Sequence, residues 1–383
     1  MSSPKSPIDL ELLTVAAKPR VGGMTSWFDQ IARGLSQRGW RVRLVAITDR
    51  IEGYEEAPFE VVHLPLGAPS KTPFALIEKW SRWRKLTSAW DSLGLTPARI
   101  RLSDGTPGVL DFASKIHKKS GVPWAVLMGG DVFAETQAIP FSSLLHSNIR
   151  KNLLRADRIL VDGSDLKTSL VDRGIPPELI RVHYHGIDLQ KFREPSTGTR
   201  FFPERSEGAS FRLVWHGRLS KHHGPERFLE IASRVANSIG RLCGGGEPSL
   251  ELKHLLREDR FDNWSLGFLP DSQLVGLLHE ADCGVYPLKE MAGVPTVLLE
   301  SMAAGLPTLT LRTGACEELI DSGKNGFILD TPERMIECLN ELRSDPDRKT
   351  VIGEAARETI ATHWSLEAML KKLEEILEEL LQK

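Results

Sequence analysis

The stretch KEMAGVPTVLLESMAAGLPTLTL, residues 289–311, carries the pattern that indicates the fold class. An apolar run ending in VYPL precedes it, Gly293 and Pro295 turn the chain, and a short helical run follows. Gly305 suits the left-handed ending of a helix, Pro307 stops that helix, and a further strand-like run completes the stretch. A helix between two successive strands is typical of a parallel sheet covered by helices.

The same alternation runs through the first half of the chain. A strand in LELLTVAAK is followed by the loop PRVGGM and by a helix from about Thr25, with Phe28, Ile31, Ala32 and Leu35 on one face. Later strand-like runs are RVRLVAIT, FEVVHLPL, RIRLS, PWAVLMGGD, RILVDGS and IRVHYHGID. Strands separated by helices predict an α/β fold with a parallel sheet covered on both faces.

Residues 193–210, REPSTGTRFFPERSEGAS, are rich in Pro, Gly, Ser and charge, and are typical of a linker. Beyond them the alternation resumes, with strands in FRLVWHGRL, WSLGFL, CGVYPL and PTLTL and with helices from about Pro225 and Asp271. We predict two Rossmann-like domains, 1–192 and 193–364. In open parallel sheets ligands bind at the carboxyl ends of the strands, so the cleft between the domains is the expected site.

The composition limits the class of protein. The chain has 383 residues, of which 41% are hydrophobic and 26% charged, as in a soluble globular protein. No apolar run has the length of a membrane span, and MSSPKSPIDL lacks the apolar core of a signal peptide. The four cysteines form no C-x-x-C pair, which favours reduced thiols in a cytoplasmic protein.

The charge is unevenly distributed. Residues 1–190 hold 25 Lys and Arg against 20 Asp and Glu, and the remainder holds 24 against 31. This asymmetry is too small for a nucleic-acid binder and suits a light contact with an anionic membrane. The segment IEKWSRWRKLTSAW, 77–90, interleaves Trp80, Trp83 and Trp90 with Lys and Arg. Such a helix fits a peripheral membrane contact or, with equal weight, packing of its tryptophans on the domain.

The first motif that bears on chemistry is the turn in residues 289–311. A helix that starts after Pro295 presents free N–H groups and a partial positive charge, which suit a phosphate. Thr296 either caps this helix or donates its hydroxyl, and Glu300 lies one turn further on. The alternative is a scaffold turn with an exposed Glu300, to which the pattern gives about half the weight.

The second motif is WHGRLSKHHGPERFLEIA, residues 215–232. A strand ends at Gly217 and Arg218, and the planar guanidinium of Arg218 suits a diphosphate. Lys221 is a point charge on the same loop, and the alternative is a solvated basic loop. A metal site at His216, His222 and His223 has unsuitable spacing, with a weight of roughly one in ten.

These motifs resemble the family 4 glycosyltransferases of the GT-B fold. The family's G-R-L-x-x-x-K-G loop corresponds to GRLSKHHG, and its long acid-pair segment corresponds to YPLKEMAGVPTVLLESMAAGLPTL. The following G-G-x-x-E corresponds to TGACEELIDSGKNGFIL. RGWRVRLV, MGGD, ADRILVDGS and HGIDLQKF match more weakly. The resemblance covers most of the chain and is most specific from 282 to 329.

The resemblance implies a retaining, metal-independent hexosyltransferase with a nucleotide diphosphate sugar as donor and no cofactor. It selects Arg218 and Lys221 for the diphosphate, and Thr296 and Val297 for phosphate at the helix start. It selects Glu300 for the ribose hydroxyls, with Glu317 in a supporting role. The flanking Gly217 and Gly293 complete the donor loops, and Gly22 and Gly23 allow the first domain's backbone to approach the phosphates. The family also sends its last helix, here 365–383, back to the first domain; a coiled-coil dimer seam is the alternative.

Three positions depart from the family pattern. The first acid of its pair is replaced by Ala292, with Glu290 two residues earlier as a substitute. The loop lysine falls on His223, so Lys221 or a protonated histidine supplies the charge. The usual histidine of the first domain is Met128; Asp131 beyond it is a candidate, although a turn-capping Asp is favoured.

The sequence leaves the function open at several points. The favoured interpretation is an active enzyme that transfers from a UDP- or GDP-linked sugar to a saccharide, glycolipid or small-molecule acceptor. The alternatives are an impaired protein that binds a nucleotide or a partner, and a GT-B-fold sugar epimerase. The expected location is the cytoplasm, or the inner face of the membrane.

Overall fold

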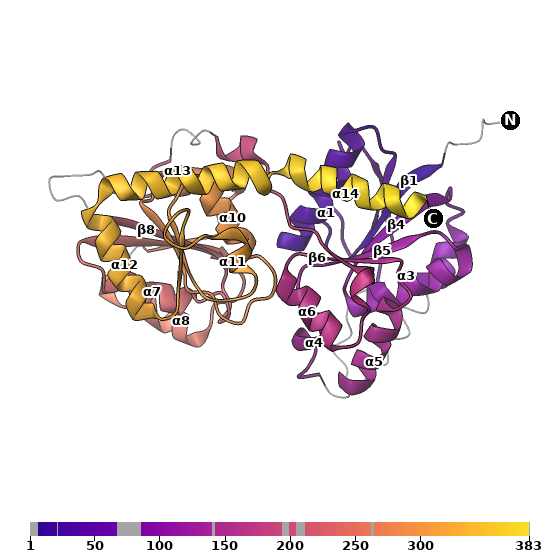
Figure 1. The fold of residues 1–383 in the computed structure, drawn as a ribbon, viewed down its shortest axis with the longest axis horizontal. Coiled ribbons are helices and arrows are strands. Elements are labelled where there is room, and N and C mark those ends of the chain that lie inside the picture. The colour runs from indigo at the N-terminus through magenta and orange to yellow at the C-terminus, as the bar shows by residue number, and fades with distance from the viewer. Residues whose placement is uncertain are drawn as a thin grey trace. The chain divides into compact units, whose positions relative to one another are not determined.

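The computed structural model describes residues 7–20, 22–66, 86–139, 142–193, 199–203, 211–261 and 264–382. The chain forms two compact units (Figure 1), of which the first comprises Met1–Tyr184 and Met369–Lys383 and the second His185–Ala368. Each unit contains one sheet, and every strand pair in both sheets is parallel. The predicted α/β class is therefore confirmed.

The first sheet has the strand order β3-β2-β1-β4-β5-β6-β7. Its strands are β1 (Ile8–Thr14), β2 (Val42–Ala46), β3 (Glu60–His63), β4 (Ala98–Asp104), β5 (Trp124–Met128), β6 (Arg158–Val161) and β7 (Ile180–Val182). The helices of this unit are α1 (Gly23–Gln37), α3 (Pro107–Ser120), α4 (Val132–Glu135), α5 (Ser142–Leu153), α6 (Ser164–Asp172), the short 3-10 helix η1 (Pro177–Leu179) and α14 (Leu366–Leu381).

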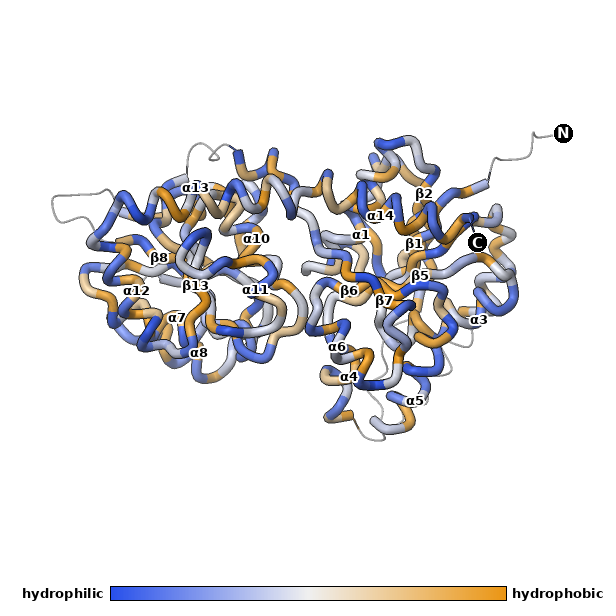
Figure 2. The backbone as a smooth tube through the Cα atoms, viewed as in Figure 1, coloured by the Kyte–Doolittle hydropathy of each residue, from blue (hydrophilic) through white to orange (hydrophobic). Residues whose placement is uncertain are grey.

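Apolar burial explains the central strands of this sheet. All residues of β2, β5 and β6 are buried, as expected where helices cover both faces of a parallel sheet. In Figure 2 the tube is largely orange near the labels β6 and β7, whereas the helices alternate between hydrophobic and hydrophilic residues. In α1 the predicted face is confirmed, because Phe28, Ile31, Ala32 and Leu35 are all buried.

The second sheet has the order β10-β9-β8-β11-β12-β13. Its strands are β8 (Phe211–Arg218), β9 (Ser238–Gly245), β10 (Ser265–Gly267), β11 (Cys283–Tyr286), β12 (Thr308–Leu311) and β13 (Phe327–Leu329). The helices are η2 (Leu189–Phe192), α7 (Pro225–Ser233), α8 (Leu250–Leu255), η3 (Asp259–Phe261), α9 (Asp271–Glu280), α10 (Thr296–Ala303), α11 (Cys316–Leu319), α12 (Pro332–Ser344) and α13 (Pro346–His363).

Strand β9 was absent from the sequence prediction, although it lies inside the sheet beside β8. Its sequence SIGRLCGG has three glycines and an arginine, so neither apolar alternation nor a continuous apolar run marks it. The glycines are required by packing. A side chain on Gly240 would overlap the ring of Trp264, and one on Gly244 would overlap the carbonyl oxygen of Gly217.

The division between the units differs from the predicted one at 192/193 and 364/365. The segment from His185 to Phe192 belongs to the second unit, where the Phe192 carbonyl accepts a hydrogen bond from His279 Nε2 at 3.0 Å. Within the predicted linker, the described residues 199–203 also pack on this unit. Phe201 and Phe202 are buried, and Arg241 Nε donates to the Phe201 carbonyl at 2.5 Å.

Helix α14 packs within the chain, as predicted. Its residues Met369, Leu370, Leu373, Ile376, Leu377 and Leu380 are buried. Gly34 of α1 faces Leu370 so closely that a side chain there would overlap it, and Trp40 Nε1 donates to Glu374 at 3.0 Å. The apolar face of α14 is thus covered by the first unit rather than by a second helix of a coiled coil.

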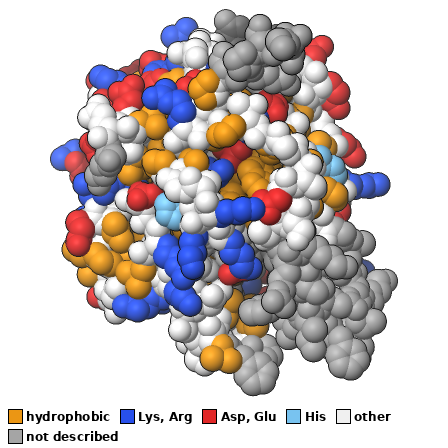
Figure 3. Space-filling model, turned by 90° about the vertical axis from the view of Figure 1, so that its right-hand side faces the viewer, with side chains coloured by type: hydrophobic (Ala, Val, Ile, Leu, Met, Phe, Trp, Pro, Cys, Tyr) orange, Lys and Arg blue, Asp and Glu red, His pale blue; other side chains and the backbone are white. Residues whose placement is uncertain are grey.

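The aromatic segment 77–90 lies mostly outside the described residues, which resume at 86; Trp80 and Trp83 are therefore not described. Trp90 packs edge-on against Phe112 with ring centroids 5.7 Å apart, and Arg101 lies over its ring. For Trp90, the interpretation that the tryptophan packs on the first unit is therefore confirmed. On the face seen in Figure 3, Lys and Arg side chains gather in part of the lower half, among acidic and hydrophobic side chains.

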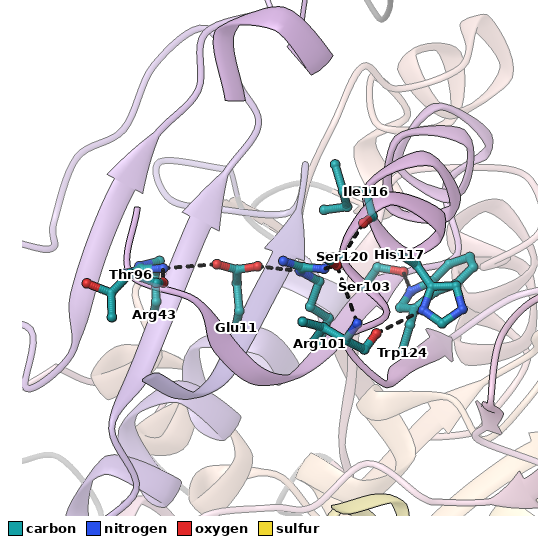
Figure 4. A network of polar contacts seen from close by, with 10 residues as sticks. Glu11, Arg43, Thr96, Arg101, Ser103, Ile116, His117, Ser120 and Trp124 are labelled. Atoms are coloured by element: carbon teal, nitrogen blue, oxygen red, sulfur yellow. Dashed lines mark hydrogen bonds and ion pairs between the residues drawn. The ribbon is translucent and has the colours of Figure 1, made fainter. Parts of the chain in front are cut away.

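A buried polar network crosses the first sheet (Figure 4). Glu11 of β1 lies in register between Arg43 of β2 and Arg101 of β4. Its carboxylate accepts from Arg43 Nη1 at 3.1 Å and from Arg101 Nε at 2.6 Å, and all three side chains are at most 5% exposed. The Thr96 carbonyl and the Ser120 hydroxyl accept further bonds from the two guanidinium groups.

Candidate functional site

Each sheet has one point at which the chain order reverses. In the second sheet the chain runs from β8 outward to β9 and β10 and then returns to β11, which pairs with the other side of β8. The carboxyl ends of β8 and β11 therefore flank a topological switch point, where ligands of open α/β sheets bind. Both predicted motifs of this unit lie there, because β8 ends at Arg218 and the turn into α10 follows β11.

The two motifs contact each other. A methyl group at Gly217 would lie 3.6 Å from Cγ1 of Val297 in the first turn of α10. His216, one residue earlier on β8, places its Nε2 2.8 Å from Glu300 Oε2. The end of β8 and the start of α10 thus form one surface, and the fold brings Arg218, Val297 and Glu300 to it.

The basic loop after β8 is anchored by backbone contacts. Leu219 N donates to the Gly245 carbonyl at 2.9 Å, and Lys289 N donates to the His222 carbonyl at 2.9 Å. Arg218 and Lys221 are both exposed, and the described residues give neither an ion pair. Two cations on an anchored loop without a carboxylate partner suit a diphosphate.

His223 does not supply the positive charge that we expected from Lys221 or a protonated histidine. Burial, aided by the nearby charges of Arg218 and His222, lowers the pKa of His223 to about 4, so the ring is neutral at pH 7. Its Nδ1 lies 2.7 Å from Ser220 Oγ, and its carbonyl accepts from Trp215 Nε1 at 3.1 Å. His223 therefore shapes the loop and leaves the charge to Arg218 and Lys221.

Helix α10 begins at Thr296 after Pro295, which takes the N-cap position with an extended backbone. Proline has no side chain that caps, and Thr296 is inside the first turn, so the interpretation of Thr296 as the cap is wrong. Its half-buried hydroxyl and the first N–H groups of α10 are left for another acceptor. Gly305 ends the helix with φ of +76°, as predicted.

Glu300 is held from behind by a chain of buried side chains. His216 contacts Glu300 through Nε2, and its Nδ1 lies 2.7 Å from the hydroxyl of Tyr286 on β11. Tyr286 in turn contacts the hydroxyl of Ser301. Burial raises the pKa of Tyr286 well above its usual value, so the phenol keeps its proton. Glu300 is 29% exposed and presents its carboxylate at the surface formed by β8 and α10.

The loop that lacks the first acid is rigidly fixed. Met291 N donates to Thr313 Oγ1 at 2.9 Å, and the Gly293 carbonyl accepts from Ala315 N at 3.0 Å. Ala292, between them, is half-buried. Glu290 adopts φ of +57°, a left-handed conformation that is costly for a residue with a side chain. Its exposed carboxylate lies 3.8 Å from His222 Nδ1.

The remaining predicted residues lie elsewhere. Glu317 is exposed in α11 and pairs with Arg312. In the first unit, Gly22 precedes α1 with φ of +152°, and Gly23 is the first residue of that helix. Asp131 caps α4 by accepting from Phe133 N at 3.0 Å, so the capping interpretation is confirmed.

Two parts of the site were not predicted from the sequence. One is the role of His216 and Tyr286 behind Glu300, and the other is the glycine loop that ends β9 beside Arg218. A methyl group at Gly246, in that loop, would lie 3.7 Å from Arg218 Cγ. In the described part of the chain, no three His, Cys, Asp or Glu side chains gather as metal ligands. His216 and His223 instead contact Glu300 and Ser220.

Comparison with known proteins identifies the family. Residues 21–191 match the model of Glycosyltransferase Family 4, and residues 210–345 match that of Glycosyl transferases group 1. The chain therefore belongs to the family 4 glycosyltransferases of the GT-B fold. This confirms the resemblance on which the sequence analysis relied.

Three relatives illustrate the similarity. The chain is 29% identical over 240 residues to D-inositol 3-phosphate glycosyltransferase of Corynebacterium jeikeium, covering 58% of this chain and 54% of the relative. It is 26% identical over 208 residues to a GDP-mannose-dependent alpha-(1-6)-phosphatidylinositol monomannoside mannosyltransferase of Mycobacterium tuberculosis, covering 50% and 54%. The matches thus span about half the length of these curated relatives. Anabaena Alr3699/HepE, solved with UDP-glucose, has a TM-score of 0.76 at 17% identity, covering 97% and 99%.

The structure gives two further findings, on the cysteines and on the described helices. All four cysteines are buried and none forms a disulfide, in line with the predicted reduced thiols. Among the described residues, no helix has the length and apolar character to cross a membrane.

Proposed function

We propose that the protein is a retaining glycosyltransferase that moves a hexosyl unit from a UDP- or GDP-linked sugar to a saccharide, glycolipid or small-molecule acceptor. One observation carries this proposal: the end of β8, where the loop with Arg218 and Lys221 starts, lies against the first turn of α10 and Glu300 at the switch point of the second sheet. Family membership supports it, as do a structural neighbour solved with UDP-glucose and a GDP-mannose-dependent relative.

The proposed donor is held at its nucleotide end. Arg218 and Lys221 bind the diphosphate, together with the N–H groups of Thr296 and Val297 at the start of α10. Glu300 accepts from the ribose hydroxyls. Gly22, Gly23, Gly217 and Gly293 are the positions at which the backbone approaches the phosphates or turns sharply. Glu317 has a supporting role through Arg312.

In the proposed reaction an acceptor hydroxyl oxygen attacks the anomeric carbon on the face from which the diphosphate leaves. The bond between that carbon and the diphosphate oxygen breaks, and the hydroxyl proton passes to the leaving phosphate. No protein base is needed, which suits a first domain with Met128 in place of histidine and with Asp131 engaged as a cap. Arg218 and Lys221 neutralise the charge that develops on the diphosphate, without metal or cofactor.

Glu290 is the proposed substitute for the family's first acid, whose position is occupied here by Ala292. Glu290 is the acidic residue of the loop between β11 and α10, and it directly precedes Met291, whose N–H is hydrogen-bonded to Thr313. The backbone of Glu290 has the left-handed conformation. Backbone strain held in place by surrounding contacts is typical of functional positions. Because Glu290 lies two residues earlier than the family's acid, a change in the bound sugar accompanies this substitution.

The assay that tests the proposed function is nucleotide release from a panel of UDP-, GDP- and ADP-hexoses in the presence of EDTA. We expect slow release from one donor without acceptor. Arg218→Ala is expected to lower the rate by roughly a hundred- to a thousandfold. Arg334→Ala, which removes an exposed arginine from α12, is the matched control and should change nothing. Equal rates for Arg218→Ala and wild type would refute the donor site.

The outcome of the panel also separates the alternatives. Absence of release together with no nucleotide binding by calorimetry would support a non-catalytic protein. Conversion of one nucleotide sugar into its epimer, detected by chromatography without acceptor, would support an epimerase. Release that persists in EDTA and yields a glycoside of retained configuration with an acceptor supports the transferase.

The proposal also includes contact with a membrane surface, where a glycolipid acceptor would be located. A glycolipid acceptor requires a light contact with an anionic membrane from its inner, cytoplasmic face, and the Trp- and Lys/Arg-rich segment 77–90 has suitable chemistry. Co-sedimentation with phosphatidylcholine vesicles, with and without phosphatidylserine, tests this contact. We expect salt-sensitive binding to the anionic vesicles that is lost on Trp80→Ala with Trp83→Ala; equal binding by wild type and this variant would exclude the segment.

A further inference from the structure

The chain of side chains behind Glu300 links three elements of the second unit. His216 lies on β8 and Tyr286 on β11, each two residues beyond the paired residues Val214 and Gly284. Glu300 lies on α10, so 84 residues separate it from His216. The ring of Tyr286 stands edge-on to His216, with centroids 5.3 Å apart at 90°.

When the ring of His216 is neutral, the hydrogen bonds among these four side chains have one consistent direction. A carboxylate only accepts, so His216 Nε2 carries the proton that bonds to Glu300. In a neutral imidazole Nδ1 is then an acceptor, and the hydroxyl of Tyr286 donates to it at 2.7 Å. The Tyr286 oxygen accepts in turn from the hydroxyl of Ser301. In this arrangement the buried polar side-chain atoms of His216, Tyr286 and Ser301 all have hydrogen-bond partners.

Burial makes the arrangement rigid. His216 is 4% exposed, and Tyr286 and Ser301 are fully buried. The ring of Tyr286 fits because position 284 is glycine: a side chain there would come within 2.8 Å of Tyr286 Cε2. Cys243, in register with His216 on β9, is also buried, and burial raises the pKa of its thiol to about 11, so it brings no charge to the site. Water therefore does not compete for Nε2 of His216.

The carboxylate of Glu300 is fixed on one side and open on the other. Oε2 is hydrogen-bonded to His216, whereas Oε1 has no hydrogen-bond partner among the described residues, and the side chain is 29% exposed. A glutamate on an exposed helix samples several rotamers, and binding a ligand then costs the entropy of ordering it. Here the protein has ordered the side chain before a ligand arrives.

We propose that His216 is a positioning residue that orients Glu300 toward a pair of vicinal hydroxyls on the ligand, and that Tyr286 fixes His216 in the required tautomer. The inference rests on the proposed donor site, in which those hydroxyls belong to the ribose. It assigns to His216 and Tyr286 a role in selecting ribonucleotides over deoxyribonucleotides. His216 itself does not touch the ligand.

Nucleotide binding by calorimetry tests this role. The probes are the nucleoside diphosphate that binds wild type best and its 2′,3′-dideoxy counterpart. His216→Leu removes the donor to Glu300, and we expect the Kd of the ribonucleotide to rise about tenfold, equivalent to about 1.4 kcal/mol. The Kd of the dideoxy nucleotide should change less than about twofold, because it lacks the hydroxyls that Glu300 binds.

Two variants distinguish positioning from folding. His216→Gln keeps an N–H donor and should restore most of the ribonucleotide affinity. Tyr286→Phe keeps the buried ring and removes only the hydroxyl that fixes the tautomer of His216. It should weaken the ribonucleotide more than the dideoxy nucleotide, with a smaller loss of affinity than His216→Leu. If His216→Leu does not fold, Tyr286→Phe provides the test. In selectively ¹⁵N-labelled protein, the His216 signal should show a proton on Nε2 and none on Nδ1.

The outcomes separate this inference from the proposed function. If wild type binds no nucleotide, the donor-site proposal fails and the inference fails with it. If wild type binds and the His216 variants weaken both nucleotides equally, the residue is only structural and the inference alone is wrong. Unchanged binding of both nucleotides, or an Nδ1–H tautomer, also overturns it.

Discussion

The carbonyl oxygen of Gly217 occupies the space that a side chain on Gly244 would need. The two glycines face each other in register across β8 and β9, directly before Arg218. The close approach of these two strand ends sets the position from which the basic loop starts. The arrangement explains why a strand as poor in side chains as β9 lies inside the sheet.

Gly244→Ala should therefore displace the end of β8 together with Arg218. We expect the affinity for the nucleotide to fall by about tenfold, because a small misplacement of a phosphate-binding group weakens its hydrogen bonds. Calorimetric titration with the diphosphate nucleotide measures the effect. Gly245→Ala is the matched control, since a side chain there meets only Phe268 at an ordinary 3.4 Å. Equal affinities of the two variants would show that the close contact has no role.

Glu11→Gln should strongly destabilise the first unit. The substitution leaves the buried guanidinium groups of Arg43 and Arg101 without their shared carboxylate, which costs roughly 3–5 kcal/mol in the free energy of unfolding. Urea unfolding followed by circular dichroism measures the loss.

The control for Glu11 lies on the same strand. Asp9→Asn removes the partner of Arg99 in a pair whose side chains are 24% and 53% exposed, and should cost less than about 1 kcal/mol. A loss of similar size in both variants would show that burial of the network is not the cause.

Ala292→Glu should lower turnover with the natural donor. Position 292 is half-buried between two backbone groups held by hydrogen bonds, so a new carboxylate there is partly removed from water. We expect about a tenfold loss, in line with the penalty for a poorly paired charge. Steady-state kinetics with the donor found in the panel measures it, with Glu290→Ala as the companion variant. A marked gain for Ala292→Glu would instead indicate a decayed acid site.

Stability should fall as the pH drops from 7 to 5. Burial lowers the pKa of His185 from 6.5 to about 4, so the unfolded chain binds a proton in this range that the folded chain does not. The stabilising contribution is complete above pH 6.5 and is lost as the pH falls toward 4. For His185 it amounts to about 2 kcal/mol between pH 7 and 5, and His223 acts in the same direction.

The matched variants for this prediction are His185→Gln and His254→Gln, since His254 is exposed on α8. The difference between the urea midpoints at pH 7 and pH 5 should shrink for His185→Gln, in which only the contribution of His223 remains, and should keep its wild-type size for His254→Gln. If the two variants show the same difference, burial of His185 does not contribute.

Much of the fold was predictable because its signals are local. The strand-turn-helix-strand pattern of 289–311 and the helical face of residues 25–35 depend on the spacing of apolar residues within one element. Strand β9 and the packing of Phe201 and Phe202 were not predictable, because their reasons are neighbours far along the chain.

The candidate site divides in the same way. Arg218 and Glu300 were identified from motifs whose residues are close in sequence. Three features required the folded chain: the neutral state of His223, the N-cap position of Pro295 in place of Thr296, and the link from Tyr286 through His216. Charge state and side-chain orientation depend on burial, which no local pattern specifies.

The sequence by itself determined that this protein has two parallel α/β units, and which loops carry its cations and acids. Those features follow from short-range periodicity and turn chemistry. The tertiary structure alone decided that Glu11 lies between Arg43 and Arg101 and that His216 holds Glu300. Both arrangements arise from strand register and from helix packing, which bring together residues separated by 32 to 90 positions and remove them from water.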